Sequence, residues 1–328
     1  MRTDVIFLSA PKSLQLYFGS TLLRGSQLSE LLATRLPGRY SFTFTTDRKQ
    51  TDCVVVLTKG FLATASLRSL ADLRASRNLL LADPLDLGMS AADLTALAAR
   101  IDGFVASSKR QMAAFKSQFP HKPVHLVTHN VDQRLPVFVP PGDELRLAYV
   151  GLRINCRHAD ELHPFGEVVE TPTDGLADRW TARLPQFNCH YALRRASEMA
   201  GLKSIIEDLF TRPPDPIVSR PFVDGWFGPP QGPVGFKPFT KGFTAAHCAC
   251  PILTERGESD AQFYLPDDYP FFLPAGTWSE VSETIMRVRE EFGGTSWRYA
   301  VDVMREVRDK SSSDHIANEF KTMLCHYQ

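Results

Sequence analysis

The amino-acid sequence predicts an α/β protein made of two Rossmann-like, doubly wound domains that face each other across a cleft. Two observations lead to this prediction. Short β-rich runs alternate with amphipathic helical stretches over the first 135 residues, and a second, less regular alternation begins at residue 145. Strands that alternate with helices of about 10–15 residues are typical of right-handed crossovers and a parallel sheet. A length of 328 residues is sufficient for about two such domains.

Six strands are expected in the first domain, each marked by a short apolar or alternating run. They occupy residues 5–8, 40–46, 53–57, 79–83, 103–106 and 124–128. The run CVVVL at residues 53–57 is apolar throughout, as expected for a parallel strand that is buried on both faces. Four helices lie between these strands: one follows Ser26, one covers residues 62–75, and Ser90 and Ser108 are expected to cap the other two.

A proline-rich stretch at residues 135–143 (LPVFVPPGD) interrupts any regular element and predicts a domain boundary. The first domain is therefore expected at residues 1–139 and the second at residues 140–328. Strands of the second domain are expected at residues 145–150, 167–171, 187–193 and 251–254, and its helices at residues 175–183, 196–210, 240–249, 278–292, 298–309 and 314–325. The last helices either stay with the second domain or pack back on the first.

The charge balance argues against one class of partner. The chain carries 37 Lys and Arg residues and 37 Asp and Glu residues, so it lacks the basic excess typical of nucleic-acid-binding proteins. The opening residues resemble a strand rather than a secretory signal, and no apolar stretch reaches the roughly 18 residues that would span a bilayer. We therefore expect a cytoplasmic protein with reduced cysteines, and peripheral contact with the inner face of a membrane stays open.

The strongest candidate site is an anion site at the start of a helix. In the run KPFTK, Pro238 precedes a helix whose first turn is expected to hold Thr240 and Lys241, and Lys237 lies just before it. Backbone N–H groups, a hydroxyl and two ammonium groups would converge there, and a diphosphate suits such a helix N-terminus. The alternative is that two lysines merely flank a solvated helix end.

This segment and three others resemble GT-B glycosyltransferases. KPFTKGFTAAHCACPILT at residues 237–254 resembles their donor-binding segment, in which a polar helix start and small residues precede an apolar strand. LAYVGLRIN at residues 147–155 resembles the first strand and loop of their C-terminal domain, and VTHNVD at residues 127–132 resembles the end of their N-terminal domain. WTARLPQFNCHYALR at residues 180–194 is similar to the segment in which such enzymes place a strand ending in arginine. The resemblance covers most of the chain in order and spacing.

The resemblance implies metal-independent transfer of a sugar from a nucleotide-sugar donor to a saccharide or lipid-linked acceptor, in glycan or surface polysaccharide synthesis, with no cofactor beyond the donor. Helix dipoles and cationic side chains would offset the negative charge that builds on the departing phosphate. The implied donor-binding residues of the second domain are Gly151, Arg153, Asn155, Arg194, Lys237, Thr240, Lys241 and Thr244. Arg194 could equally be a surface residue, and Asn155 could simply cap a helix.

One pair of positions departs from the family pattern. Many retaining members carry two glutamates eight residues apart around the donor-binding helix, and here Phe236 and Thr244 stand at those positions. This departure argues against ribose recognition by a glutamate, as in those members. It also argues against assignment to the large family-four group of glycosyltransferases.

The acceptor is expected to bind the first domain. Arg24, Gly25 and Ser26 lie where the first strand leads into the first helix, and a glycine there would let the backbone approach a ligand closely. The alternative is a tight turn with Ser26 as the N-cap of the helix.

Asp83 and Asp86 are the best candidates for a general base or for a hydrogen-bond acceptor of a sugar hydroxyl. They lie at the end of a strand and just after it, and an inverting reaction needs a base that deprotonates the acceptor hydroxyl. Either aspartate could instead cap the helix that begins near Ser90. His129 also lies at a strand end, where it is either a third catalytic candidate or a structural residue.

Other signals are weaker. His247, Cys248 and Cys250 have no second pair at zinc-site spacing, so no metal site is expected. No Gly-x-Gly-x-x-Gly motif follows the first strand, which argues against dinucleotide binding. Two further functions stay open beside the transferase: a sugar-nucleotide epimerase of the same fold and a non-catalytic carbohydrate-binding relative.

Overall fold

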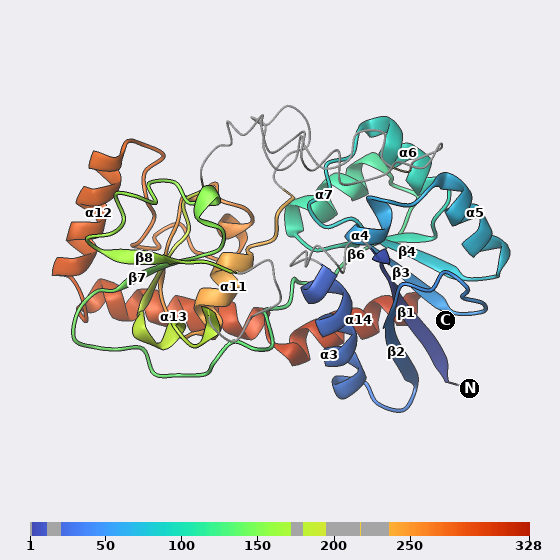
Figure 1. Ribbon diagram of the computed structural model, residues 1–328, viewed down its shortest axis with the longest axis horizontal. Helices are drawn as coiled ribbons and strands as arrows, with labels where there is room; N and C mark the ends of the chain where they lie inside the picture. The colour runs from blue at the N-terminus through green and yellow to red at the C-terminus, as the bar shows by residue number, and fades with distance from the viewer. Residues whose placement is uncertain (1, 12–20, 172–179, 195–216, 218–235) are drawn as a thin grey trace. The chain divides into compact units, whose positions relative to one another are not determined.

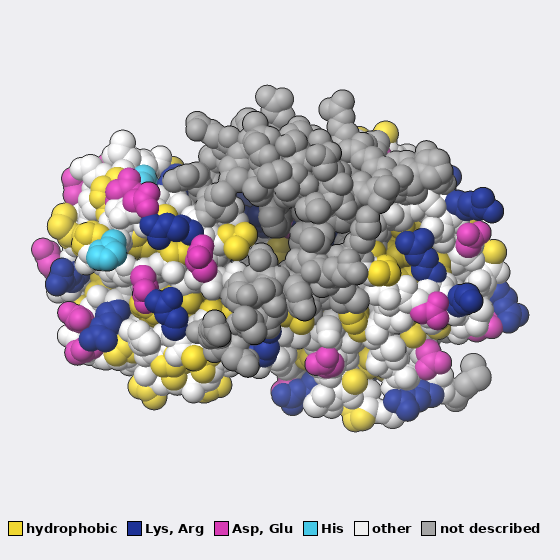
Figure 2. Space-filling model, in the orientation of Figure 1, with side chains coloured by type: hydrophobic (Ala, Val, Ile, Leu, Met, Phe, Trp, Pro, Cys, Tyr) yellow, Lys and Arg dark blue, Asp and Glu magenta, His cyan; other side chains and the backbone are white. Residues whose placement is uncertain are grey.

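The computed structural model of the chain describes residues 2–11, 21–171, 180–194, 217 and 236–328. The chain forms two compact units, whose elements are labelled in Figure 1. The first unit comprises Met1–Asn130, Ser197–Pro238 and Ser313–Gln328, and the second comprises Val131–Ala196 and Phe239–Ser312. On the face seen in Figure 2, basic and acidic side chains are interspersed over both units, in line with the neutral total charge.

The first unit contains a six-stranded parallel sheet in the order β2-β1-β3-β4-β5-β6. All six predicted strands are present: β1 (Thr3–Leu8), β2 (Tyr40–Thr45), β3 (Val54–Thr58), β4 (Leu79–Asp83), β5 (Gly103–Ala106) and β6 (Val124–Leu126). Every residue of β3 is buried, as its apolar run predicts. The prediction of a doubly wound α/β domain is therefore confirmed for the first half of the chain.

Helices cover both faces of this sheet. They are η1 (Leu22–Gln27), α3 (Leu28–Arg35), α4 (Lys59–Leu62), α5 (Leu67–Ala75), α6 (Ala91–Ala98), α7 (Lys109–Gln118) and α14 (Ser313–His326). Ser90 and Ser108 cap α6 and α7 as predicted, since each side chain accepts a hydrogen bond from a backbone N–H three residues later.

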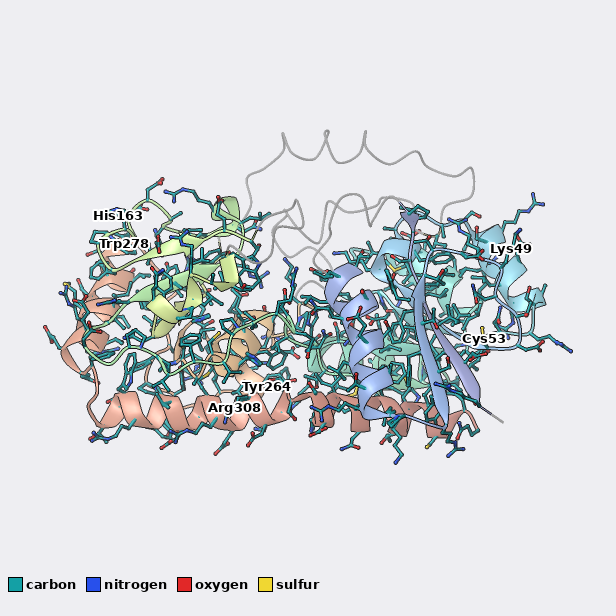
Figure 3. The ribbon with its side chains drawn as sticks, turned by 60° about the horizontal axis from the view of Figure 1, so that its bottom comes forward. Lys49, Cys53, His163, Tyr264, Trp278 and Arg308 are labelled. Carbon is teal, nitrogen blue, oxygen red and sulfur yellow. The ribbon has the colours of Figure 1, made fainter. Side chains whose placement is uncertain are left out.

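Side chains of β1 alternate between two apolar layers, which explains how the sheet holds helices on each side. Val5 and Phe7 pack in the layer that includes α3 and α14, and Ile6 and Leu8 pack in the layer that includes α4, α5, α6 and α7. The Phe7 and Phe320 rings lie 5.6 Å apart between β1 and α14. The C-terminal helix α14 therefore belongs to the core of the first unit, along the sheet face that it covers in Figure 3.

The second unit contains a four-stranded parallel sheet in the order β10-β9-β7-β8. Its strands are β7 (Leu147–Val150), β8 (Gly166–Val169), β9 (Cys189–Tyr191) and β10 (Ile252–Leu253). Its helices are η2 (Arg153–Asn155), η3 (Leu184–Gln186), α11 (Thr240–His247), η4 (Ala261–Phe263), α12 (Trp278–Glu290) and α13 (Thr295–Lys310). The helices expected at 175–183 and 196–210 fall largely or wholly outside the described residues.

The division between the units differs from the predicted boundary at residues 139 and 140. It follows Asn130, because Val131 and Leu135 are buried in the apolar core of the second unit. Lys237 belongs to the first unit and not to the second, because the segment that ends at Pro238 is part of the first unit. In that segment the Phe236 ring packs on the Phe115 ring, with 5.8 Å between the ring centroids. The assignment of Lys237 to the donor-binding domain is therefore corrected.

The Gly166→Ala substitution is expected to destabilise the second unit by about 2–3 kcal/mol. A Cβ on residue 166 would lie 2.0 Å from the backbone oxygen of Leu147, its partner on β7, so the two strands would have to separate. Urea unfolding followed by circular dichroism measures the change. Gly257→Ala is the matched control, because a Cβ there meets nothing within 4 Å. Equal stability of the two variants would contradict the prediction.

Candidate active site

Polar side chains gather at the carboxyl ends of the strands, the edge at which parallel α/β sheets bind ligands. In the first unit we call Arg24, Lys59, Asp83, Asp86 and His129 the first-unit cluster. Lys59 directly follows β3, Asp83 ends β4, and His129 lies beyond β6. The fold thus brings together four residues that the sequence assigned to acceptor binding or catalysis.

The centre of the first-unit cluster is a buried ion pair between Arg24 and Asp83, whose side chains are only 2% and 1% exposed. Arg24 Nε donates to Asp83 Oδ2 at 2.9 Å, and Nη2 lies 2.7 Å from the same oxygen. Arg24 Nη1 donates to the backbone oxygens of Val127, at 3.0 Å, and Thr128, at 3.2 Å. The other carboxylate oxygen, Asp83 Oδ1, is buried and accepts no hydrogen bond from the described residues. Burial raises the pKa of Asp83, and the attraction of Arg24 opposes that rise.

The helix that carries Arg24 begins earlier than the sequence predicts. The π-helical turn η1 continues directly into α3, so residues 24–26 lie inside a helix and the alternative of a tight turn is wrong. Ser26 is not an N-cap either, because its hydroxyl donates to Glu30 at 3.0 Å. A Cβ on Gly25 would lie 2.5 Å from the Phe44 ring, so this glycine lets η1 pack closely against β2.

Asp86 lies beside two ammonium groups. Lys59 Nζ donates to Asp86 Oδ1 at 2.6 Å, and Lys237 Nζ lies 3.8 Å from Oδ2. Burial alone would raise the pKa of Asp86, but the two lysines outweigh it and hold that pKa well below its usual value. No aspartate of this cluster caps the following helix, because Ser90 and Asp93 form the capping box of α6. The helix-cap alternative is therefore wrong.

His129 is buried and neutral. Its Nδ1–H donates to the backbone oxygen of Asn130 at 2.7 Å. Burial, together with the nearby positive charge of Arg24, lowers the pKa of His129 to about 3. At neutral pH this imidazole is a weak base, so among the three catalytic candidates it is poorly suited to take a proton.

The second unit has its own polar cluster, the second-unit cluster, which contains Tyr149, Arg194, Lys241, Glu258 and Ser259. Lys241, in the first turn of α11, donates to the backbone oxygen of Val150 at the end of β7 and lies 3.9 Å from the centroid of the Tyr149 ring. A Cβ on Gly151 would lie 3.0 Å from Lys241 Nζ. Gly151 also has a φ of 146°, which a residue with a side chain rarely adopts.

Arg194 follows β9 and forms an ion pair with Glu258. Its guanidinium donates to the Glu258 carboxylate, and Nη2 also donates to Ser259 Oγ at 2.7 Å. The Ser259 hydroxyl in turn donates to Glu258 at 2.8 Å. Both charged side chains are mostly buried, which contradicts the alternative that Arg194 is a surface residue.

The other residues assigned to donor binding make local contacts. Arg153 is about half exposed and pairs with Asp160 at 2.5 Å. Asn155 lies at the end of η2, whose N-cap is another residue, so the cap alternative for Asn155 is wrong. Thr244 Oγ1 donates to the backbone oxygen of Thr240 at 2.9 Å within α11, so this hydroxyl is satisfied by its own helix.

Sequence reasoning missed Lys59, Tyr149 and Glu258. Lys59 comes directly after the buried strand β3, so the rule that selected Asp83 would also have selected Lys59. Glu258 follows β10 by a few residues in an irregular stretch, and its pairing with Arg194 bridges 64 positions of sequence. The apolar strand run that contains Tyr149 predicts a core residue, and its contact with Lys241 in the structure shows that it belongs to the cluster.

The described residues contain neither a cluster of metal ligands nor a helix that could span a membrane. Among them, no three His, Cys, Asp or Glu side chains gather in a group that could hold a metal ion. In the same part of the chain, no helix combines the length and the apolar character needed to cross a bilayer. His247, Cys248 and Cys250 form no such group, and the two cysteines are buried free thiols.

Comparisons with known proteins establish the fold. No family model matches the chain, and no curated protein matches its sequence. The structure is similar to sucrose-phosphate synthase from Thermosynechococcus elongatus (13% identity, TM-score 0.54, 99% of each chain covered). It is similar to Anabaena HepE, solved with UDP and glucose (10% identity, TM-score 0.56, 99% of this chain and 100% of that chain). A glycosyltransferase from Rickettsia africae also matches (6% identity, TM-score 0.57, 98% of this chain and 97% of that chain). The chain therefore has the GT-B fold, and the resemblance expected from its sequence is confirmed for the fold.

Proposed function

We propose that this protein is a metal-independent glycosyltransferase, which moves a sugar from a nucleotide-activated donor to a saccharide or lipid-linked acceptor. The observation that carries the proposal is the pair of clusters at the strand ends, one in each unit of a GT-B fold. A similar structure, HepE, was solved with UDP and glucose, which supports a nucleotide-sugar donor here. The setting we propose is glycan or surface polysaccharide synthesis in the cytoplasm, at the inner face of the membrane when the acceptor is lipid-linked.

The second unit supplies positive charge for the donor. Breaking the bond between sugar and phosphate builds negative charge on the departing diphosphate. The Lys241 ammonium lies at the end of β7 and comes from the first turn of α11, and an ammonium and a helix N-terminus both favour an anion. Arg194 lies just beyond β9, and its guanidinium, already paired with Glu258, is a second source of N–H donors for the diphosphate rather than an uncompensated charge. Because Val150 and Tyr149 already hold the Lys241 ammonium in place, little reorganisation is needed when the donor binds.

The first unit supplies a base for the acceptor. An inverting reaction needs a carboxylate whose pKa lies near the working pH and whose oxygen can receive a proton. Of the two aspartates we assign this role to Asp83, because burial raises its pKa against the attraction of Arg24, and its Oδ1 accepts no hydrogen bond from the described residues. Asp86 is a weaker base, because Lys59 and Lys237 lower its pKa. In a retaining reaction, Asp83 would instead accept a hydrogen bond from a sugar hydroxyl.

The Lys241→Met substitution is expected to weaken UDP binding by at least tenfold, because it removes a held ammonium group and keeps the aliphatic packing. Calorimetric titration with UDP and the other nucleoside diphosphates measures the effect and identifies the nucleobase that the donor site prefers. Lys237→Met is the matched control four residues away, and we expect a change below about threefold because Lys237 faces Asp86 in the first unit. Absence of any nucleoside diphosphate binding by the wild type, or equal losses in both variants, would refute the proposal.

A further inference from the structure

A carboxylate on the C-terminal helix reaches the loop that follows β6. Glu319 of α14 accepts a hydrogen bond from the backbone N–H of Thr128 at 2.6 Å, and its other oxygen accepts one from the Thr128 hydroxyl at 3.2 Å. The two residues are 191 positions apart in sequence. Thr128 itself is buried, so without Glu319 its N–H would be left without this partner in the interior.

The same peptide group also contacts Arg24. The N–H of Thr128 and the C=O of Val127 belong to one peptide unit, and Arg24 Nη1 donates to that C=O at 3.0 Å. Glu319 therefore binds one end of the peptide dipole and Arg24 binds the other. Hydrogen bonds in such a chain strengthen one another, because each polarises the next. Arg24 then pairs with Asp83, so a continuous hydrogen-bonded path leads from α14 to the proposed base.

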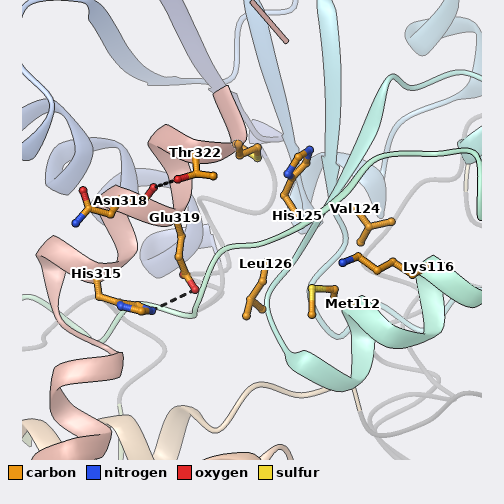
Figure 4. A pocket seen from close by; sticks show the side chains of 10 residues that line it. Met112, Lys116, Val124, His125, Leu126, His315, Asn318, Glu319 and Thr322 are labelled. Atoms are coloured by element: carbon orange, nitrogen blue, oxygen red, sulfur yellow. Dashed lines mark hydrogen bonds and ion pairs between the residues drawn. The ribbon is translucent and has the colours of Figure 1, made fainter. Parts of the chain in front are cut away.

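Glu319 is not required merely to hold α14 on the first unit. Ile316, Phe320 and Met323 of the same helix are buried in the apolar core and dock it there. Glu319 is 18% exposed, and it lines an open cavity of about 420 Å³ (Figure 4). In that cavity His315 Nε2, one turn earlier on α14, lies 3.3 Å from Glu319 Oε1. The carboxylate thus has a solvent-side partner and an interior partner, and the interior contact leads to the Arg24–Asp83 pair.

We propose that Glu319 is a positioning residue for the reaction: it fixes the Val127–Thr128 peptide, which holds Arg24 against Asp83. With Arg24 held on Oδ2, the second carboxylate oxygen, Oδ1, which is buried and accepts no hydrogen bond from the described residues, keeps its lone pairs for the acceptor hydroxyl. This inference rests on the proposed function, and it adds a residue from the C-terminal helix to the catalytic arrangement of the first unit.

The kinetic test uses Glu319→Ala, Glu319→Gln and the control His315→Ala, which removes the solvent-side partner of Glu319. Glu319→Ala is expected to lower kcat about tenfold, to leave KM for the donor unchanged within twofold, and to shift the acidic limb of the pH profile, which reports the protonation of Asp83 as the general base. Glu319→Gln keeps an acceptor oxygen for Thr128 and is expected to recover most of the lost kcat. An unchanged pH profile in Glu319→Ala, with any loss of activity explained by a lower melting temperature, would overturn the proposal.

A second measurement needs no turnover. The Nε–H resonance of Arg24, assigned by its disappearance in Arg24→Lys, reports how firmly the guanidinium is held. We expect its exchange with water to become at least tenfold faster in Glu319→Ala and to stay unchanged in His315→Ala. If Glu319→Ala does not fold, Glu319→Gln is used, with an expected increase of about threefold. If exchange in Glu319→Ala equals that of the wild type, the positioning role is refuted. If exchange is faster in Glu319→Ala but the wild-type protein shows no transferase activity, the proposed function alone is refuted.

Discussion

Asp83→Asn is expected to lower the rate of sugar transfer by about 10²–10⁴-fold, the usual contribution of a general base. Asparagine keeps the size of the side chain and an oxygen that accepts from Arg24 Nε, but it cannot take a proton from the acceptor hydroxyl. Affinity for UDP is expected to stay within about twofold, because Lys241 and Arg194 belong to the other unit. Steady-state kinetics with saturating donor, combined with calorimetric titration of UDP, separates the two effects.

The same substitution also affects stability, because it leaves the buried Arg24 charge without its counter-ion. Removing one partner of a buried pair typically costs about 3–5 kcal/mol, so kinetics must be measured below the lowered melting temperature. Asp52→Asn is the matched control: Asp52 pairs with Arg77 at the same 2.7 Å, but both side chains are more than half exposed. An exposed pair contributes about 1 kcal/mol or less. Full activity in Asp83→Asn would exclude Asp83 as the base.

The sheet of the first unit could be predicted from sequence because its signal is local. Strand β3 is a continuous apolar run, and the capping serines Ser90 and Ser108 precede apolar helical patterns, so each element is recognisable without its neighbours. The strand-end rule then selected Asp83 and His129 as site residues.

Contacts between distant segments were not predictable in this way. The partner of Asp83 is 59 positions away, on a π-helical turn that begins without a side-chain cap and before the Ser26 at which the sequence suggests a helix start. Lys237 and Lys241 look equivalent in the run KPFTK, yet the chain passes from one unit to the other between them. The apolar face of α14 predicts burial, but nothing in its spacing indicates which sheet it covers. Contacts of this kind depend on the tertiary packing of segments that are distant in sequence, and local periodicity carries no information about that packing.

Acidification from pH 6.5 to pH 5 is expected to destabilise the second unit by about 2 kcal/mol through His190 alone. His190 lies on β9, and burial, with a smaller effect of Lys241, lowers its pKa to about 3. The native state keeps this imidazole neutral, whereas the unfolded chain binds a proton below about pH 6.5. The unfolded state therefore binds more protons in this range, and stability falls as the pH falls, by about 1.4 kcal/mol per pH unit until the native pKa is reached.

The second unit is the cleaner place to measure this effect. In the first unit His129 acts in the same direction, but the raised pKa of Asp83 acts in the opposite one, because there the native state holds the extra proton. Three of the chain's four tryptophans, Trp180, Trp278 and Trp297, lie in the second unit, so urea unfolding followed by tryptophan fluorescence reports mainly on it.

A comparison of two histidine variants isolates the contribution of His190. His190→Gln cannot bind a proton in either state, so its unfolding free energy is expected to depend on pH less steeply than that of the wild type, by about 1.4 kcal/mol per unit between pH 6 and pH 4. His163→Gln is the matched control in the same unit, at an exposed position (Figure 3), and it is expected to follow the wild type. If His190→Gln and the wild type lose stability in parallel on acidification, then His190 is protonated in the folded protein and the burial argument for its low pKa fails.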